Sequence, residues 1–259
     1  MKKVLTGIAA VLAAAVMLAS CNDSALSDEV AEGTAARGTT NYTRSYQICN
    51  LVYEGYNGGS KGPISVTRGK LNNKYTCYLV CLSGTESVSN QSTGYLTDAL
   101  SGFNLNNAYV TNVVKVITAN VPSGSRLILA GHSLGGMVCQ QVAANDTIKN
   151  RYVVMNTVTF GSPLLSAGSR EGTVKRLGDV SDPVPYMSGS LINNTAWAIA
   201  GLQRENGGYG TAGITAHTQS YYRSDEWAKY DAVGTKNGSN YIALDLSTKK
   251  FYKSPTSVK

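Results

Sequence analysis

Apolar residues along this chain fall into short runs and helical spacings that alternate through most of its length. Short apolar runs predict strands over residues 64–71, 75–83, 127–130, 152–160 and 174–180. Apolar positions three and four residues apart predict a helix over 107–120 and another directly after residue 133. Strands interleaved with helices predict an α/β fold with a mostly parallel central sheet and helices on both faces.

Three further stretches complete the pattern. Residues 42–53 fit a first helix or a first strand equally well. The polar residues 72–74 indicate a hairpin between the first two predicted strands. Residues 241–246 alternate with period two and are followed by Phe251, which predicts a terminal hairpin at the edge of the sheet rather than a second domain.

The sharpest change of pattern lies at residues 131–135, where Gly-His-Ser-Leu-Gly separates a buried strand from a helix. Small residues around a strained turn let the serine hydroxyl stand clear of the backbone, and the helix N-terminus lies beside the reacting oxygen. Ser133 is therefore the candidate nucleophile. In a chain with 27 glycines the motif alone is weak, and residues 58–62 also match it. No buried strand precedes that second copy and Pro63 follows it, so we expect a polar loop there.

The candidate acid and base follow the serine in the chain. Asp182 stands in a proline-stiffened loop after the strand over 174–180, which places it at the rim of such a sheet, with Asp179 as the competing acid. The chain has two histidines. His132 adjoins the nucleophile and should point away from it, in packing or hydrogen bonding, so His217 is the candidate base. The order serine, aspartate, histidine is that of α/β-hydrolases.

An oxyanion hole is expected where the strand over 75–83 ends in Gly84-Thr85. Thr85 would offer its amide and hydroxyl, and Leu134 would offer the amide that follows the nucleophile. Residues 87–105 are polar and loop-like, in a place where an active-site cover can lie, and they show no long amphipathic helix.

The N-terminus has the pattern of an export signal. A basic start and an apolar stretch over 4–18, too short to span a membrane comfortably, precede Leu-Ala-Ser-Cys at 18–21. That tetrapeptide resembles the lipobox of bacterial lipoproteins, which implies removal of residues 1–20 and lipidation of Cys21. An ordinary signal peptide is the alternative. We expect a flexible tether over 21–41, a folded domain over 42–259, and attachment to the outer membrane or cell surface.

Charge and cysteine content narrow the range of partners. The formal charge of +7 falls to roughly +5 without Lys2 and Lys3, and the basic residues are scattered, which argues against nucleic-acid binding. Nothing in the spacing of cysteine and histidine indicates a metal, no cofactor is expected, and we expect a monomer. Four cysteines remain after position 21, and they are expected either as buried thiols or in two disulfides. Cys77 and Cys81 share one predicted strand about 13 Å apart, so they cannot pair with each other. The four cysteines are Cys49, Cys77, Cys81 and Cys139.

Five blocks of the sequence, in order, resemble the fungal-type class 3 lipases of the α/β-hydrolase fold. The blocks are Ser-Gly-Thr at 83–85, Gly-His-Ser-Leu-Gly-Gly at 131–136, Thr-Phe-Gly-Ser-Pro at 159–163, Asp-Pro-Val-Pro at 182–185 and the segment around residue 217. The resemblance implies hydrolysis of carboxylic esters of lipids by Ser133, Asp182 and His217. The family usually has arginine where this chain has Ser83, which argues against lid-gated interfacial activation. Phospholipase A1, an acyltransferase and a non-catalytic surface binding lipoprotein are the alternatives.

Overall fold

The computed structural model describes residues 38–84, 108–166, 168–187 and 201–255. The strands of this part form one mixed nine-stranded sheet in the order β1-β8-β2-β3-β4-β5-β6-β7, with β9 paired to β2. The strands are β1 (Thr39–Tyr42), β2 (Ile64–Leu71), β3 (Tyr75–Leu82), β4 (Arg126–His132), β5 (Val153–Phe160), β6 (Thr173–Asp179), β7 (Leu202–Glu205), β8 (Ile242–Asp245) and β9 (Lys250–Tyr252). The α-helices are α2 (Ser45–Tyr53), α4 (Ala108–Asn120), α5 (Leu134–Ala144), α6 (Asp146–Arg151), α8 (Gly213–Gln219) and α9 (Ser224–Trp227), with 3-10 turns η1 (Val184–Tyr186) and η2 (Leu246–Thr248).

The strands from β3 to β7 are parallel neighbours, and the antiparallel pairs lie on the other side of the sheet. Parallel strands are covered on both faces, which explains the nearly continuous apolar runs of β3 and β4. The carboxyl ends of β3 to β6 therefore meet at one edge, where residues from distant parts of the chain come together. The predicted α/β architecture is confirmed.

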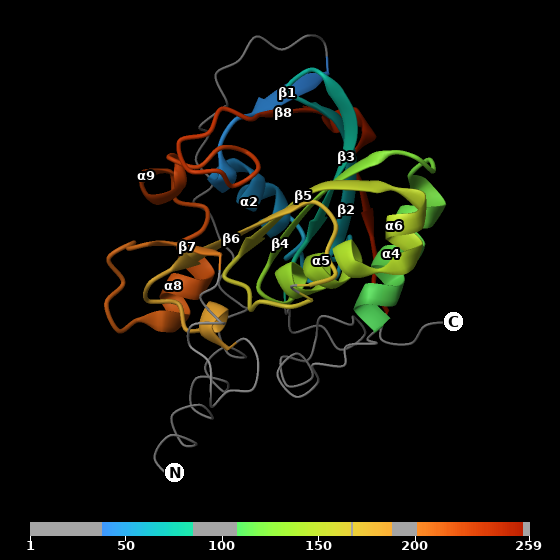
Figure 1. Cartoon of the computed structure of the whole chain (residues 1–259). Helices are drawn as coiled ribbons and strands as arrows, with labels where there is room; N and C mark the ends of the chain where they lie inside the picture. The colour runs from blue at the N-terminus through green and yellow to red at the C-terminus, as the bar shows by residue number, and fades with distance from the viewer. Residues whose placement is uncertain (1–37, 85–107, 167, 188–200, 256–259) are drawn as a thin grey trace.

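Helices pack on both faces of the sheet (Figure 1). One core contains apolar side chains of α4, α5 and α6 against β3 and β4, including Val113, Val138 and Ile148. The other contains α2 and the segment around α9, including Ile48 and Trp227, against the opposite sides of the same strands. The prediction of helices on both faces is confirmed.

The edge of the sheet differs from the prediction in two places. The stretch that fitted either a helix or a strand is a helix, α2, and a short strand, β1, precedes it. Because β1 begins at Thr39, the folded part starts before Tyr42, earlier than expected. The predicted terminal hairpin is wrong: β8 lies between β1 and β2, while β9 pairs with β2, so η2 leads the chain to a new position along β2 instead of back along β8.

The hairpin between β2 and β3 is confirmed, with full antiparallel pairing and left-handed backbone at Asn72 and Asn73. The four cysteines of the described residues are free thiols, all buried. The sequence left open whether these cysteines are buried thiols or form two disulfides, and the structure shows buried thiols. Cys21 and residues 87–105, on which the lipidation and cover predictions rest, lie outside the described residues. Within the described ranges, no helix combines the length and apolar character needed to cross a bilayer.

Candidate active site

The turn from β4 into α5 holds Ser133 in a conformation that few residues other than glycine adopt. Its backbone has φ 54° and ψ −124°, a strained geometry that places the side chain at the tip of the turn. The N–H of Ser133 donates to the carbonyl oxygen of Phe160 at 2.9 Å, which ties the turn to the end of β5. The sequence prediction of a strand, a sharp turn and a helix is confirmed.

Two glycines let the turn close this tightly. A Cβ at Gly131 would lie 2.5 Å from the backbone of Gly135, and a Cβ at Gly135 would overlap the carbonyl oxygen of Leu82. The first turn of α5 therefore lies directly against the ends of β3 and β4. The Leu134 N–H belongs to the first helical turn, whose N–H groups have no partner within the helix.

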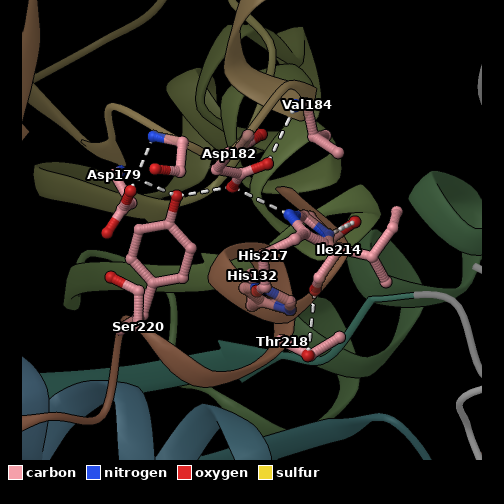
Figure 2. Close-up of polar contacts among 12 residues, drawn as sticks. His132, Asp179, Asp182, Val184, Ile214, His217, Thr218 and Ser220 are labelled. Atoms are coloured by element: carbon pink, nitrogen blue, oxygen red, sulfur yellow. Dashed lines mark hydrogen bonds and ion pairs between the residues drawn. The ribbon is translucent and has the colours of Figure 1, made fainter. Parts of the chain in front are cut away.

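Asp182, His217 and Ser133 form one continuous hydrogen-bonded row. His217 Nδ1 lies 2.8 Å from Asp182 Oδ2, and His217 Nε2 lies 3.0 Å from Ser133 Oγ. Asp182 follows β6 and His217 lies in α8, so three separate segments supply the row. Figure 2 shows the Asp182 carboxylate directed toward the His217 ring. The carboxylate only accepts, so Nδ1 carries the proton and Nε2 is left to accept from the serine hydroxyl.

The Asp182 carboxylate is fully buried and receives two further hydrogen bonds. Oδ1 accepts from the Val184 N–H at 2.8 Å, and Oδ2 accepts from the Tyr221 hydroxyl at 2.5 Å. The Tyr221 hydroxyl itself accepts from the Asp179 N–H at 3.1 Å. Burial raises the pKa of Tyr221 well above its usual value, and the Asp182 charge acts in the same direction, so the hydroxyl stays a donor. The buried carboxylate thus accepts three hydrogen bonds, one each from His217, Val184 and Tyr221.

Asp179, the competing acid, faces away from His217 and into a different buried group. Its Oδ1 accepts from the Ser181 N–H at 2.7 Å and its Oδ2 from the Gly207 N–H at 3.0 Å. Glu226 lies beside it, and burial together with the hydrogen bond and charge of Asp179 raises the pKa of that glutamate to about 7. The structure thus brings Asp182, and not Asp179, to the histidine.

His132 points away from the serine hydroxyl, as expected, and its ring is buried among aromatic side chains. Nδ1 lies 2.5 Å from the Tyr56 hydroxyl, and Nε2 lies 2.9 Å from the carbonyl oxygen of His217. The Tyr53 ring packs 5.0 Å from the His132 ring. Burial and the nearby His217 lower the pKa of His132 well below its usual value, so its ring is neutral.

Sequence reasoning missed Tyr56 and Tyr221. With 16 tyrosines in the chain, neither stood out, although the position of Tyr221 one helical turn after His217 was the available signal. Of the predicted oxyanion groups, the Leu134 amide lies at the start of α5 beside Ser133. Thr85 lies outside the described residues; Gly84, which precedes it, is described and packs against Ser133, because a Cβ there would be 2.8 Å from the serine Cβ.

The arrangement is chemically suited to nucleophilic attack by a serine with a histidine as base and a carboxylate behind it. Among the described residues, no group of three or more histidine, cysteine or acidic side chains is placed to hold a metal ion.

Comparison with known proteins gave no match: no family model, no curated protein and no solved structure resembles the chain at a significant level.

Proposed function

We propose that this protein is a serine hydrolase of the α/β-hydrolase type that cleaves carboxylic esters. The observation that carries the proposal is the row Ser133 Oγ, His217 Nε2, His217 Nδ1, Asp182 Oδ2, with successive contacts of 3.0 and 2.8 Å. It is supported by the backbone of Ser133, with φ 54° and ψ −124°, which is typical of the strained strand-to-helix turn that holds the nucleophile in α/β-hydrolases. A histidine paired with a buried carboxylate for packing alone has no need of a serine hydroxyl on its second nitrogen.

In the acylation step, Ser133 Oγ attacks the ester carbonyl carbon while His217 Nε2 takes the hydroxyl proton. The imidazolium formed is stabilised by Asp182, which stays ionised and holds the ring in the orientation needed. The tetrahedral intermediate collapses when His217 returns the proton to the leaving alcohol, and an ester on Ser133 remains. Water, deprotonated by His217, then attacks this acyl-enzyme; the acid leaves as the bond to Ser133 Oγ breaks, and His217 returns the proton to Oγ.

The negative oxygen of the intermediate requires donors beside Ser133. The Leu134 N–H, at the start of α5, supplies one, and the amide and hydroxyl of Thr85 supply the other. Each such donor is worth about 3 kcal/mol of transition-state stabilisation. The positive end of the α5 dipole adds to the same field.

Lipids are the proposed substrate class. This rests on the resemblance to class 3 lipases and on the lipobox at Cys21, since a lipid anchor would keep the site close to acyl substrates. Triacylglycerols or shorter esters are proposed first, with phospholipid acyl chains cleaved at the A1 position as the variant. The anchor would attach the protein to the outer membrane or cell surface, and neither a nucleic acid nor a cofactor has a part in the mechanism.

The test is hydrolysis of p-nitrophenyl esters, from short to long acyl chains, by the purified protein and by Ser133→Ala. We expect activity that the substitution abolishes, and the chain-length profile separates an esterase from a lipase. Phospholipid vesicles test the A1 variant, and product analysis with an added alcohol detects acyl transfer. Absence of hydrolysis together with absence of labelling by a fluorophosphonate would refute the proposal and favour a binding lipoprotein.

A further inference from the structure

We propose that Tyr56 and His132 are positioning residues that join the end of β3 to the backbone of His217 through one chain of hydrogen bonds, and thereby set the geometry of the active site. The inference rests on the proposed function, because it concerns the same site. It assigns a task to the half-buried Tyr56 and the buried His132, which lie outside the serine, histidine and aspartate row.

The first arm of the chain holds Gly84. The Gly84 N–H donates to the Tyr56 hydroxyl at 2.8 Å. A Cβ on Gly84 would lie 2.5 Å from that hydroxyl, 2.8 Å from the Ser133 Cβ and 2.9 Å from the carbonyl oxygen of His132. Gly84 is therefore held against the nucleophile on one side and against Tyr56 on the other. Any movement of the Tyr56 hydroxyl changes how the end of β3 faces Ser133.

The second arm reaches the candidate base. His132 Nε2 lies 2.9 Å from the His217 carbonyl oxygen, which only accepts, so Nε2 carries the proton of the neutral ring. Nδ1 must then accept, and its partner at 2.5 Å is the Tyr56 hydroxyl, which donates. The direction of every bond is thus fixed, from Gly84 to Tyr56 to His132, and from His132 to the His217 backbone.

The surroundings keep this chain in one state. His132 is 3% exposed, and the Tyr53 ring at 5.0 Å and the His217 ring at 4.7 Å pack against it. The Tyr53 hydroxyl donates to the Thr218 carbonyl oxygen at 3.0 Å, next to His217, which fixes the same turn of α8. Protonation of His132 would place a second cation beside the imidazolium that His217 becomes during the reaction. A neutral ring with a fixed tautomer avoids that repulsion and can hold both arms.

The hydrogen-bond chain should affect the kinetic constants in a way that a merely structural role would not. Ground-state binding of the substrate does not depend on it, whereas the transition state needs the nucleophile, base and oxyanion donors in register. Loss of this hydrogen-bond chain should lower kcat and leave KM nearly unchanged. It should also weaken a tetrahedral inhibitor by the same factor as it lowers kcat/KM.

The test uses Tyr56→Phe in the full chain, with Tyr152→Phe as a matched control. Tyr152 is a buried tyrosine outside the site, and its hydroxyl donates to the Val121 carbonyl oxygen at 3.0 Å in the core on the α4 side. We expect Tyr56→Phe to lower kcat about tenfold, and to raise the inhibition constant of a trifluoromethyl ketone by the same factor. The control should keep kcat within about twofold. Equal kcat in both variants would overturn the inference.

Two substitutions of His132 separate the arms, and they carry the test if Tyr56→Phe does not fold. His132→Asn keeps an acceptor near the position of Nδ1 and loses the donor to His217. His132→Gln keeps a donor near Nε2 and loses the acceptor for Tyr56. Each should lower kcat less than His132→Leu, which removes both functions. If all three substitutions lower kcat equally, or none does, the two-armed chain is refuted.

Hydrogen exchange of the Gly84 amide distinguishes failure of this inference from failure of the proposed function. The amide should be protected in the wild type and lose protection in Tyr56→Phe. Lost protection with unchanged kcat would refute the positioning role while the hydrolase stands. A protected Gly84 in a wild-type protein that neither hydrolyses esters nor reacts with a fluorophosphonate would refute the proposed function, and the positioning role with it.

Discussion

Glu226 should make the protein less stable as the pH rises toward neutrality, and Glu226→Gln should remove that effect. The side chain is 5% exposed, its Oε1 accepts from the Ser220 hydroxyl at 2.7 Å, and Arg223 Nη1 lies 3.8 Å from Oε2. Burial first, and then the hydrogen bond and charge of Asp179, raise the pKa of Glu226 from 4.5 to about 7. The folded protein therefore holds a proton that the unfolded chain releases.

The sign and size follow from proton linkage. Below about pH 4.5 both states are protonated and the contribution to stability is fully present; between about 4.5 and 7 only the unfolded state loses the proton, so the free energy of unfolding falls. At about 1.4 kcal/mol per pKa unit, the total loss by pH 7 is at most about 3 kcal/mol. A neutral glutamine keeps the acceptor for Ser220 and supplies an N–H donor to Asp179, without the titration.

The assay is urea unfolding of the wild type and Glu226→Gln at several pH values from about 4 to 8. The free energy of unfolding of the wild type should fall relative to the variant by up to about 3 kcal/mol across this window. Subtracting the two curves cancels other groups, such as His132, whose lowered pKa has the opposite effect on stability. Asp179→Asn removes one cause and should shrink the slope. A difference that is constant with pH would refute the assignment of a proton to this carboxyl pair.

Three further predictions concern the site itself. Gly161→Ala should abolish activity, because the new Cβ would lie 2.7 Å from Asp182 Oδ2 and 3.1 Å from His217 Nδ1; an active, folded variant would contradict the geometry. Tyr221→Phe removes one donor from the Asp182 carboxylate, which orients His217, and should lower kcat about tenfold; an unchanged kcat in ester assays would contradict this. Asp182→Asn should lower kcat about 10⁴-fold and Asp179→Asn far less, and the reverse ranking in ester assays would exchange their roles.

Local sequence patterns predicted the elements that place the candidate site. The strand, turn and helix around Ser133 could be predicted because each part has its own requirement: an apolar strand, small residues in a strained turn, and helical spacing. Asp182 could be preferred over Asp179 because two prolines, Pro183 and Pro185, stiffen the loop that begins at Asp182. These inferences need only neighbouring residues, and the structure brings the three predicted side chains together.

Contacts between distant segments could not be read from the same patterns. The position of β8 between β1 and β2 depends on pairing between the two ends of the folded part, and the period-two alternation of residues 241–246 is the same for an edge hairpin as for an inner strand. The roles of the Tyr56 and Tyr221 hydroxyls depend on hydrogen bonds to His132 and Asp182, which are distant in the sequence, and an amphipathic tyrosine fits a surface pattern as well as a core pattern.

The most direct test of the central claim is to identify the residue that a fluorophosphonate modifies in the intact protein, by mass spectrometry of its peptides. The account predicts a single adduct on Ser133 in the folded wild type, formed in parallel with loss of ester hydrolysis, and a greatly slowed reaction in His217→Asn. An adduct on another residue, or a folded protein that hydrolyses esters while Ser133 stays unmodified, would contradict it.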